Sequence, residues 1–585
     1  MIRWQTLLAL ISLVALRLLL AGWFATMTPL WEYFDEVNHY YVAQYRGGID
    51  DTLPQNDWAE QYQIFNQFNQ PPLYHFFVGR LIRPFSQAIP TPIGNPPPFC
   101  LNPQPNNFYI HNLDAETPFA QPYRGIWLAR SITILVGAIS VIGVWFAARL
   151  LWSQFPNRAW IATLLYALFS PAIALSTWFN NDAPLMLIGV LALILLAQAL
   201  KSGFSWRALA SLIVIFIIGI GIKINTIALA PALFFVVLER WIFRSKQGRI
   251  RRLTLMILGI ILLGVIFAGV NVAICGQSMC RTHRALTLEN FTVLTNPFIN
   301  QYTLPSLQQL LETLGAPSAN PAYSSPDWIV TVVWIVLGVG MVSIGLSAWE
   351  SPDDRKALIL LFVISFSALG LGLLRVWWLG IAFLPARYLA LAFPALILII
   401  AAGYDFLRLR LHWLMSLLPA LIFLAANVIA IQYSYAPLWQ MPEKLPQVPE
   451  NITLSDMQFE NGLNVVGFSV DEDIINLYLS TNEVLQDSLA LEVTMLDGGG
   501  QILSHCELLA GSPLWSTSNW RVNEIVVQPV LLPELSSVLD TMYVRIRLIA
   551  LQNDVFVDTI PDYENEILTL SDSNWIVISP DNVSN

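Results

Sequence analysis

Residues 7–45 read LLALISLVALRLLLAGWFATMTPLWEYFDEVNHYYVAQY, a long apolar run followed at once by an acidic and aromatic one. A helix needs about 20 apolar residues to cross the hydrocarbon core of a bilayer. The first run meets this length, so we predict a span over residues 5–27. It exceeds the core of a secretory signal and has no small-residue cleavage pattern, so it is interpreted as a retained anchor.

The composition of the whole chain agrees with a membrane protein. Of 585 residues, 55% are hydrophobic and only 12% are charged, whereas soluble domains carry about 25% charged residues. Disorder, collagen and a small disulfide scaffold are excluded on the same grounds. We therefore predict a polytopic α-helical membrane protein of about eleven spans. Their ranges are 5–27, 126–148, 160–178, 183–200, 208–222, 224–239, 254–274, 327–347, 358–378, 388–406 and 413–433.

Basic loops predict how these spans are oriented. FRSKQGRIRRL at 243–253 holds five basic residues, and three shorter loops add more. They all fall on one side if the N-terminus is cytoplasmic, because Lys and Arg favour the inner face. The loops 28–123 and 275–326 and the whole tail then lie outside. The stretch 208–239 has basic ends and must cross an even number of times, so two short helices meeting near Lys223 fit best.

The tail differs from the membrane body, which we place at 1–433. It holds 4 basic and 22 acidic side chains, and such a charge would repel nucleic acid. The Pro-rich segment 434–450 is typical of a linker. Short alternating runs over 451–585, with turns such as DGGG at 497–500, predict a soluble β-sandwich.

All four cysteines fall on the predicted external side. Cys275 and Cys280 are close enough for a small disulfide loop, and Cys100 and Cys506 pair only if the tail meets the first loop. An oxidising compartment favours bridges, but four free thiols are the alternative.

The acidic segment after the first span is the first candidate site. If it is helical, Glu32, Asp35, Glu36 and His39 share one face. A carboxylate that is partly desolvated at the bilayer rim gains the basicity of a general base. The alternative is an interfacial helix whose acidic stripe is merely solvated.

A second segment, NQFNQPPLYHFFVGRLIRPF at 66–85, includes Tyr74 and His75. Its two prolines start a helix that is too short and too charged to span, so we expect it along the outer leaflet. The alternative is a structural ledge without chemistry.

A third segment, STWFNNDAPLML at 176–187, forms a short external turn. Asp182 stands where a helix N-cap is expected, and that role alone could explain it. Asn181 adds polarity on the same side as Asp35.

Three isolated cations complete the candidates: Lys223, Arg375 and Arg387. Cations at the outer rim suit a lipid-linked phosphate. Snorkelling to lipid headgroups is the alternative.

The order of these motifs resembles the GT-C membrane glycosyltransferases, which include the protein O-mannosyltransferases and the lipid A aminoarabinose transferases. PLWEYFDE is similar to the first-loop motif of that group and QPPLYH to its KPPL or HPPLYY segment. FNNDAPLMLIG, GIKINTIALAP and LPARYLALAFPAL are similar to later elements. The chain departs from the pattern at Gln70, where the aminoarabinose enzymes have a lysine, and at Ala386, which replaces a glycine.

The resemblance implies transfer of a sugar from a polyprenyl-phosphate donor to an external acceptor, in a bacterial plasma membrane. Asp35 would act as the base, with Glu36 and Asp182 beside it in the catalytic group. Direct displacement would invert the anomeric configuration. The donor would be bound by His39, Tyr74, His75, Asn181, Lys223, Arg375 and Arg387.

Several alternatives stay open at this point. Asp35, Glu36 and Asp182 are candidate ligands of Mg²⁺ or Mn²⁺, because hard cations prefer carboxylate oxygen. The acceptor can be a glycan, a lipid or a protein. Rival functions are a lipid or polysaccharide transporter or flippase, a polymerase or ligase using the same carriers, and a noncatalytic glycan-binding scaffold. Walker, HExxH, GxSxG and CxxC motifs are absent from the sequence.

Overall fold

The fold is given by a computed structural model of the chain. It describes residues 4–33, 35–49, 70–87, 111, 116–118, 120–203, 205–239, 302–315, 326–350, 352–379, 383–436, 441–450, 452–458, 462–471, 474–485, 489–496, 502–512, 515–531, 543–550 and 576–578.

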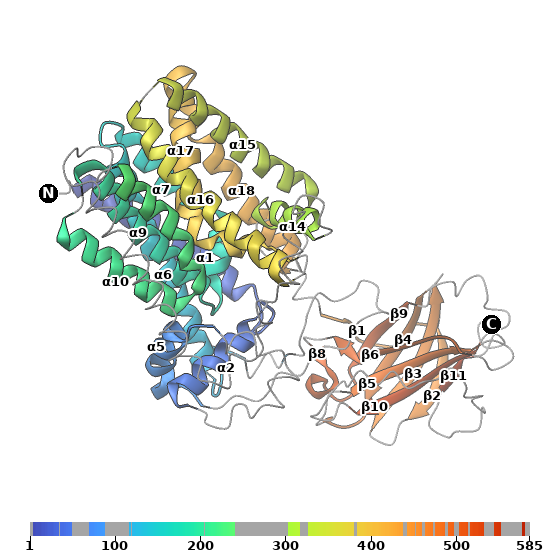
Figure 1. The fold of residues 1–585 in the computed structure, drawn as a ribbon. Helices are drawn as coiled ribbons and strands as arrows, with labels where there is room; N and C mark the ends of the chain where they lie inside the picture. The colour runs from blue at the N-terminus through green and yellow to red at the C-terminus, as the bar shows by residue number, and fades with distance from the viewer. Residues whose placement is uncertain are drawn as a thin grey trace. The chain divides into compact units, whose positions relative to one another are not determined.

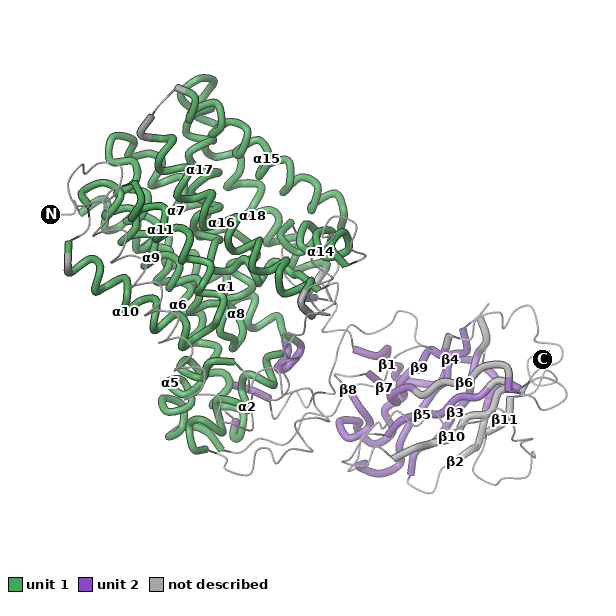
Figure 2. The backbone as a smooth tube through the Cα atoms, viewed as in Figure 1, with its two compact units in different colours: residues 1–28, 33–88, 121–435 green, residues 29–32, 89–120, 436–585 purple. Residues whose placement is uncertain are grey.

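The chain forms two compact units (Figure 2). The first holds residues 1–28, 33–88 and 121–435, and the second holds 29–32, 89–120 and 436–585. Residues 29–32, which follow α1 closely, therefore belong to the same compact unit as the C-terminal strands.

The first unit is helical (Figure 1). Its elements are α1 (Trp4–Thr26), α2 (Glu36–Gly47), α5 (Leu73–Ile82), η1 (Arg83–Phe85), α6 (Arg124–Leu151), α7 (Pro156–Leu168), α8 (Ser170–Thr177), α9 (Asp182–Ser202), α10 (Trp206–Ile222), η2 (Ile224–Leu229), α11 (Ala230–Val237), α14 (Thr303–Gly315), α15 (Asp327–Glu350), α16 (Pro352–Leu379), η6 (Ala386–Ala392), α17 (Phe393–Arg410), η7 (Trp413–Ser416), α18 (Leu418–Ala430) and η8 (Ile431–Tyr435).

Seven of the described helices are long and apolar enough to cross a membrane. An eighth span results if α7 and α8 count as one, with a bend of 51° between them. Pro171 lies at the start of α8, where a proline ends the preceding helix. The predicted span 254–274 lies outside the described residues. A polytopic helical membrane protein is thus confirmed, and the count of eleven stays a prediction.

The apolar stretch 208–239 breaks where the sequence predicted. α10 ends at Ile222, and Lys223 takes an extended conformation before η2 and α11 continue the chain. The buried Lys223 side chain interrupts the run because an ammonium group needs a polar partner at this depth.

The segment after α1 differs from the prediction. Helix α2 begins only at Glu36, and Asp35 before it has a φ of 71° in the left-handed region. The expectation that Glu32, Asp35, Glu36 and His39 line one helical face is therefore wrong. The turn gives the two neighbouring carboxylates Asp35 and Glu36 different surroundings.

The second unit is all-β in its C-terminal part. Its strands are β1 (Glu443–Leu445), β2 (Thr453–Gln458), β3 (Leu463–Asp471), β4 (Ile474–Thr481), β5 (Leu489–Leu496), β6 (Ile502–Leu509), β7 (Gly511–Ser512), β8 (Trp515–Ser516), β9 (Ile525–Leu531), β10 (Tyr543–Ala550) and β11 (Ile576–Ile578), with a 3₁₀ turn η10 (Thr517–Asn519).

These strands form antiparallel sheets in the orders β1-β9-β4-β3-β2 and β11-β10-β5-β6, with β7 and β8 as a separate pair. Alternate residues such as Leu477 and Leu479 in one sheet, and Leu491 and Val493 in the other, are buried. Such alternation gives each sheet an apolar face. The all-β tail is confirmed. The predicted disulfides lie outside the described side chains.

Candidate functional site

The candidate site gathers at one end of the helical unit. It is built from the C-terminal ends of α1, α8, α10 and α16 and from the start of α2, α9 and η6. Because consecutive spans run in opposite directions, these ends belong to one side of the bundle. The acidic segment, the Asn-Asn-Asp turn and the three cations all come from them, as the sequence predicted.

Each of the three candidate carboxylates has a cation as its partner. Arg387 donates from Nη2 to Asp35 Oδ2 over 2.8 Å, and Lys223 Nζ donates to Asp182 Oδ1 over 2.5 Å. Arg130 binds Glu36 in a bidentate pair of 2.6 and 2.8 Å. Charged hydrogen bonds of this kind offset part of the cost of burying the groups.

The predicted cations meet around one aromatic ring. Arg375 lies 4.5 Å from the ring centroid of Tyr388, Arg387 lies 5.8 Å from it and Lys223 lies 6.0 Å from it. The face of an aromatic ring attracts cations over such distances. We call Lys223, Arg375, Arg387, Asp35 and Asp182, together with Tyr388, the Tyr388 cluster.

The two carboxylates of the cluster share this space. Arg387 interacts electrostatically with both Asp35 and Asp182, and so does Tyr33. Burial raises the pKa of the Tyr33 hydroxyl well above its usual value, so this neighbour stays neutral. The predicted meeting of the acidic segment with the cations is present in the structure.

The described side chains of the Tyr388 cluster carry a surplus of one positive charge. Lys223 and Arg387 are each paired with a carboxylate. Arg375 has no carboxylate partner among the described residues, and its Nη1 is buried without a hydrogen bond. A buried donor of a charged group that lacks an acceptor requires an explanation, and an anionic ligand would provide one.

Other unsatisfied polar atoms belong to the same end of the bundle. Asn181 Oδ1, His75 Nδ1 and Trp178 Nε1 are buried and lack a hydrogen-bond partner in the described part of the chain. Buried polar groups normally find partners. A ligand bound at this end of the bundle would supply the missing partners of these three atoms.

Asp35 is the most accessible of the three carboxylates. Its side chain is 16% exposed, against 3% for Asp182 and 0% for Glu36. Arg387 binds Oδ2, and Oδ1 has no hydrogen-bond partner among the described residues. Asp35 Oδ1 is therefore available for a further hydrogen bond while the ion pair holds the carboxylate in place.

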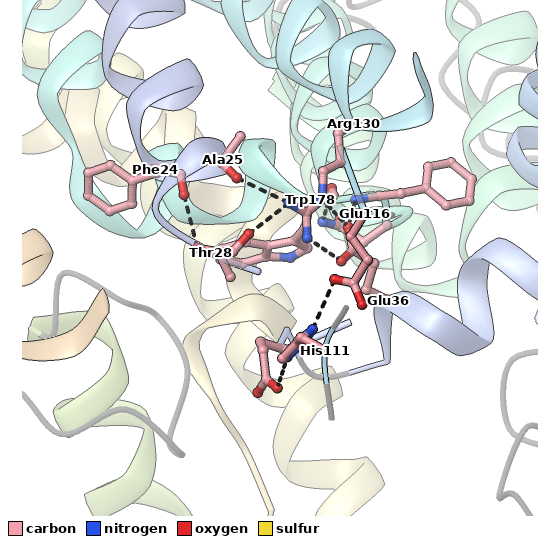
Figure 3. A network of polar contacts seen from close by, with 11 residues as sticks. Phe24, Ala25, Thr28, Glu36, His111, Glu116, Arg130 and Trp178 are labelled. Atoms are coloured by element: carbon pink, nitrogen blue, oxygen red, sulfur yellow. Dashed lines mark hydrogen bonds and ion pairs between the residues drawn. The ribbon is translucent and has the colours of Figure 1, made fainter. Parts of the chain in front are cut away.

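Glu36 has a different position from its neighbour. Its Oε1 accepts both from Arg130 and from the Phe179 backbone N–H at 3.0 Å. Arg130 also donates to the carbonyl oxygens of Ala25 and Thr28 (Figure 3). The pair thus joins the end of α1, the start of α2, α6 and the turn before α9, and it fixes the backbone next to Asp35.

The turn before α9 corrects the expected role of Asp182. The alternative in which Asp182 serves only as the N-cap of α9 is wrong, because Asp182 is the first residue of the helix and Asn181 is at the N-cap position. Asn180 Oδ1 accepts from the N–H groups of Asp182 and Ala183, at 2.7 and 3.3 Å. The Asp182 carboxylate is therefore available to Lys223. Asn181 Nδ2 donates to Gln70 Oε1.

The predicted donor-binding residues His39, Tyr74 and His75 lie where α2 packs against α5. His39 Nδ1 and His75 Nε2 are 2.8 Å apart, and Tyr74 bonds with Thr133 on α6. Both imidazoles are buried, and this lowers the pKa of His75 to about 3 and that of His39 well below its usual value. Burial raises the pKa of Tyr74 above its usual range. All three are neutral near pH 7.

The close packing of α2 on α5 depends on a glycine crossing. A Cβ on Gly79 would collide with the backbone oxygen of Ala43 and with the Cα of Gly47. The two helices of the first loop therefore form a tight pair that carries Asp35 at its start.

A separate polar group lies in the second unit. His111 bonds with Glu32 through Nε2 at 2.7 Å and with Glu116 through Nδ1 at 3.0 Å (Figure 3). Desolvation acts against protonation, but the two carboxylates outweigh it and raise the pKa of His111 to about 9. Asn519 in η10 donates to the His111 carbonyl. Glu32, predicted on the acidic face, thus folds with the C-terminal unit.

The predicted metal ligands do not fit a metal site. Among the described residues, no three His, Cys, Asp or Glu side chains form a group that could hold a metal ion. Asp35, Glu36 and Asp182 each face a different cation. The three carboxylates are therefore not arranged around a common position where one divalent ion would bind.

Two residues of the site were missed by sequence reasoning. Tyr388 follows Arg387 in ARYLALAF, and its aromatic ring beside a cation was the available signal. Arg130 lies near the start of a predicted span, where a charged residue indicates a function or a buried partner.

Comparison with known proteins supports the resemblance inferred from the motifs. No curated protein matches the chain. Residues 123–268 match the model of the dolichyl-phosphate-mannose-protein mannosyltransferase family, PMT_2. The matched range contains Asp182 and Lys223 but not Asp35, Arg375 or Arg387. Over residues 123–268 the chain is therefore similar to a family of GT-C-type membrane glycosyltransferases, and the resemblance is confirmed.

Proposed function

We propose that the protein transfers a sugar from a polyprenyl-phosphate donor to an acceptor on the extracytoplasmic side of a bacterial plasma membrane. The observation that carries this proposal is the surplus positive charge of the Tyr388 cluster at one end of an apolar helix bundle. A lipid-linked donor stays in the bilayer, so its phosphate must be bound at the rim of the apolar region.

The charge of the cluster matches that of the donor. A polyprenyl-phosphate sugar is a phosphodiester with one negative charge, and the described side chains of the cluster carry three positive and two negative charges. Among the described residues, Arg375 is the cation of the cluster without a carboxylate partner, so we assign it the first contact with the phosphate. Its planar guanidinium suits two phosphate oxygens at once.

The same cations support the leaving group. When the bond from the anomeric carbon to phosphate breaks, the departing polyprenyl phosphate gains negative charge. Fixed cations near that charge stabilise the transition state more than the ground state. Lys223 and Arg387, already held by Asp182 and Asp35, are placed to do so with little rearrangement.

Asp35 is the proposed general base. The acceptor hydroxyl must lose its proton as it attacks the anomeric carbon, and Asp35 Oδ1 can accept it. Arg387 keeps the carboxylate oriented through Oδ2. Attack by the acceptor on the face opposite to the phosphate inverts the configuration of the sugar.

The other predicted site residues support this step. Glu36 and Arg130 hold the backbone beside Asp35, and Asp182 orients Lys223. His39, His75 and Tyr74 stabilise the α2–α5 pair, with His75 Nδ1 and Asn181 Oδ1 as groups that the donor sugar can engage. Mannose is the first sugar to test, because the matched family model names it.

The experiment is a transfer assay in membrane vesicles with radiolabelled polyprenyl-phosphate hexoses, beginning with mannose. Asp35→Asn should lower transfer by about 10²- to 10⁴-fold, the usual loss of a general base, while the protein remains folded by size-exclusion profile. Asp327→Asn is the matched control, because Asp327 is an exposed aspartate in the first turn of α15.

Undiminished transfer by Asp35→Asn would reject the base assignment. Lipid translocation across sealed vesicles without glycosyl transfer would favour the transporter or flippase. Glycan binding by the β-rich unit, with no turnover of any donor, would favour the noncatalytic scaffold.

A further inference from the structure

Helix α14 binds both chain segments that carry the arginines of the Tyr388 cluster. Trp377 Nε1 donates to Thr303 Oγ1 over 2.9 Å, two residues beyond Arg375 in α16. Gln309 Oε1 accepts from the Leu384 backbone N–H over 2.8 Å. Thr313 Oγ1 accepts from the Ala386 backbone N–H over 2.8 Å. Figure 1 shows α14 beside the ends of α15 and α16.

The start of η6 needs these acceptors. The first N–H groups of a helix have no acceptor within it, and the Pro385 cap of η6 offers no side-chain bond. Leu384 and Ala386 are fully buried, so water cannot replace a missing partner. Buried backbone N–H groups without acceptors are rare in folded proteins.

α14 is itself attached to the bundle, which makes it a firm support. Trp334 Nε1 on α15 donates to the Leu311 carbonyl over 2.7 Å. Thr313 Oγ1 donates to the Gln309 carbonyl at 2.7 Å while it accepts from Ala386. The hydroxyl is thereby fixed in the orientation in which its lone pair faces the N–H group next to Arg387.

From these contacts we infer that α14 is a brace that sets the positions of Arg375 and Arg387 around Tyr388. Gln309 and Thr313 are positioning residues: they act through the backbone before Arg387 and not by touching the donor. The inference rests on the proposed function, because it assigns the two residues to the donor-phosphate site. It also gives the second external loop, 275–326, a role.

The test uses the full-length protein in lipid nanodiscs with Gln309→Ala, Thr313→Val and Thr313→Ser. Valine keeps the shape of threonine but cannot accept from Ala386, whereas serine keeps the hydroxyl. Thr163→Val is the matched control, since Thr163 is also buried and donates to the Ala159 carbonyl in its own helix, and no backbone N–H of the described residues is bonded to its hydroxyl. The readouts are transfer kinetics with polyprenyl-phosphate mannose and hydrogen exchange of residues 384–387.

The brace predicts faster exchange of residues 384–387 and a rise of about 10-fold in donor KM for Thr313→Val, in line with the loss of one hydrogen-bond acceptor for a buried group. kcat should fall as well, because Arg387 also orients Asp35 and stabilises the leaving group. Thr313→Ser should restore both values, and Thr163→Val should leave both unchanged.

Unchanged exchange and unchanged KM in Thr313→Val and Gln309→Ala would overturn the brace. An equal loss in Thr163→Val would also overturn it, because the effect would then reflect general destabilisation. Failure of the wild-type protein to bind or use any polyprenyl-phosphate donor would instead reject the proposed function. Hydrogen exchange distinguishes the two failures, because it reports the support of the turn without any donor.

Discussion

Two buried charge clusters of the helical unit contain the same kinds of residue but differ in how completely their bonds are made. In the first, the Tyr388 cluster, Asp35 and Asp182 face Arg387 and Lys223. In the second, Arg158 on α7 binds Asp354 at 2.6 Å and Asp405 at 3.2 Å. Arg408 and Ser347 bind these carboxylates as well. We call Arg158, Asp354, Asp405 and Arg408 the Arg158 cluster.

Among the described side chains, the charges of the Arg158 cluster balance. Its two cations balance its two carboxylates, and the Arg158 guanidinium also lies 4.2 Å from the Phe155 ring centroid. None of its four side chains has a buried polar atom without a partner in the described part of the chain. Such a network needs no ligand, and its role is to hold α7, α16 and α17 together.

The described side chains of the Tyr388 cluster, by contrast, carry one surplus positive charge and leave Arg375 Nη1 without a hydrogen bond. A buried ion pair alone therefore does not indicate a binding site, because both clusters contain such pairs. What separates a binding site from a structural network is the set of bonds that the protein leaves unmade.

The largest effect on stability is expected in the Arg158 cluster. Arg158→Met leaves Asp354 and Asp405 buried without their shared cation, which should lower the free energy of unfolding by about 3–5 kcal/mol. Thermal unfolding in detergent measures this. The specific activity of the folded fraction should stay at the wild-type level, and a selective loss of activity at unchanged stability would remove the distinction between the clusters.

Mild acid should loosen the site end of the bundle first. The pKa values of His39 and His75 lie far below the value of about 6.5 of the unfolded chain. Below pH 6.5 the unfolded chain binds protons that the folded pair refuses, so stability falls as pH falls, by up to about 1.4 kcal/mol per pH unit for each histidine. Relative to the intrinsic exchange rate at each pH, the rate of hydrogen exchange in α2 and α5 should rise between pH 6.5 and 5.

The control lies within the same experiment. The Arg158 cluster contains no histidine, so exchange of α7 and α17 should keep its ordinary pH dependence. His75→Phe should reduce the extra acid sensitivity, because only His39 then remains, and an unchanged acid sensitivity in that variant would assign the effect elsewhere.

Alkaline pH should act on the second unit in the opposite direction. His111 has a folded pKa of about 9, above its unfolded value. Its contribution is therefore fully present below about pH 6.5 and is lost as pH rises through 9, again at up to about 1.4 kcal/mol per pH unit. Thermal unfolding of the strands between pH 7 and 9.5 measures this. His111→Gln, which carries no charge, should show no such slope.

The smallest effect concerns the charge of the site. Asp182→Asn removes one negative charge and frees Lys223 for the donor phosphate, so donor KM should fall by about 5- to 10-fold, about 1 kcal/mol. kcat should fall as well, because a tighter hold on polyprenyl phosphate slows its release. A rise in KM would show that Asp182 serves the site only by positioning Lys223.

The order of the long apolar segments could be predicted from the sequence, because it depends on hydropathy alone. Spans such as α6 and α15 follow from apolar length, and the break at Lys223 follows from one charge in an apolar run. The same reasoning failed at Asp35, where a left-handed backbone moves the start of α2. Nothing in the local sequence requires that turn, because its support comes from Arg130, 94 residues away from Glu36.

The sequence indicated which residues belong to the candidate site, but not which of them form ion pairs with one another. Polar residues at the ends of spans are few, so Asp35, Asp182 and the cations could be named from the sequence. Their pairing could not, since Asp35 and Arg387 are 352 residues apart. The bonds from the first N–H groups of α9 to Asn180 Oδ1, which leave the Asp182 carboxylate to Lys223, also depend on a side-chain geometry that composition does not encode.

The donor-site assignment is tested most directly by the binding of a short-chain polyprenyl phosphate to the purified protein in nanodiscs. It needs no knowledge of the sugar or the acceptor. Arg375→Gln should weaken the affinity by about 10-fold or more, the loss of one charged hydrogen bond, whereas Arg408→Gln in the Arg158 cluster should bind as the wild type does. Equal affinity of Arg375→Gln and the wild type, or an equal loss in Arg408→Gln, would contradict the assignment of the Tyr388 cluster as the donor site.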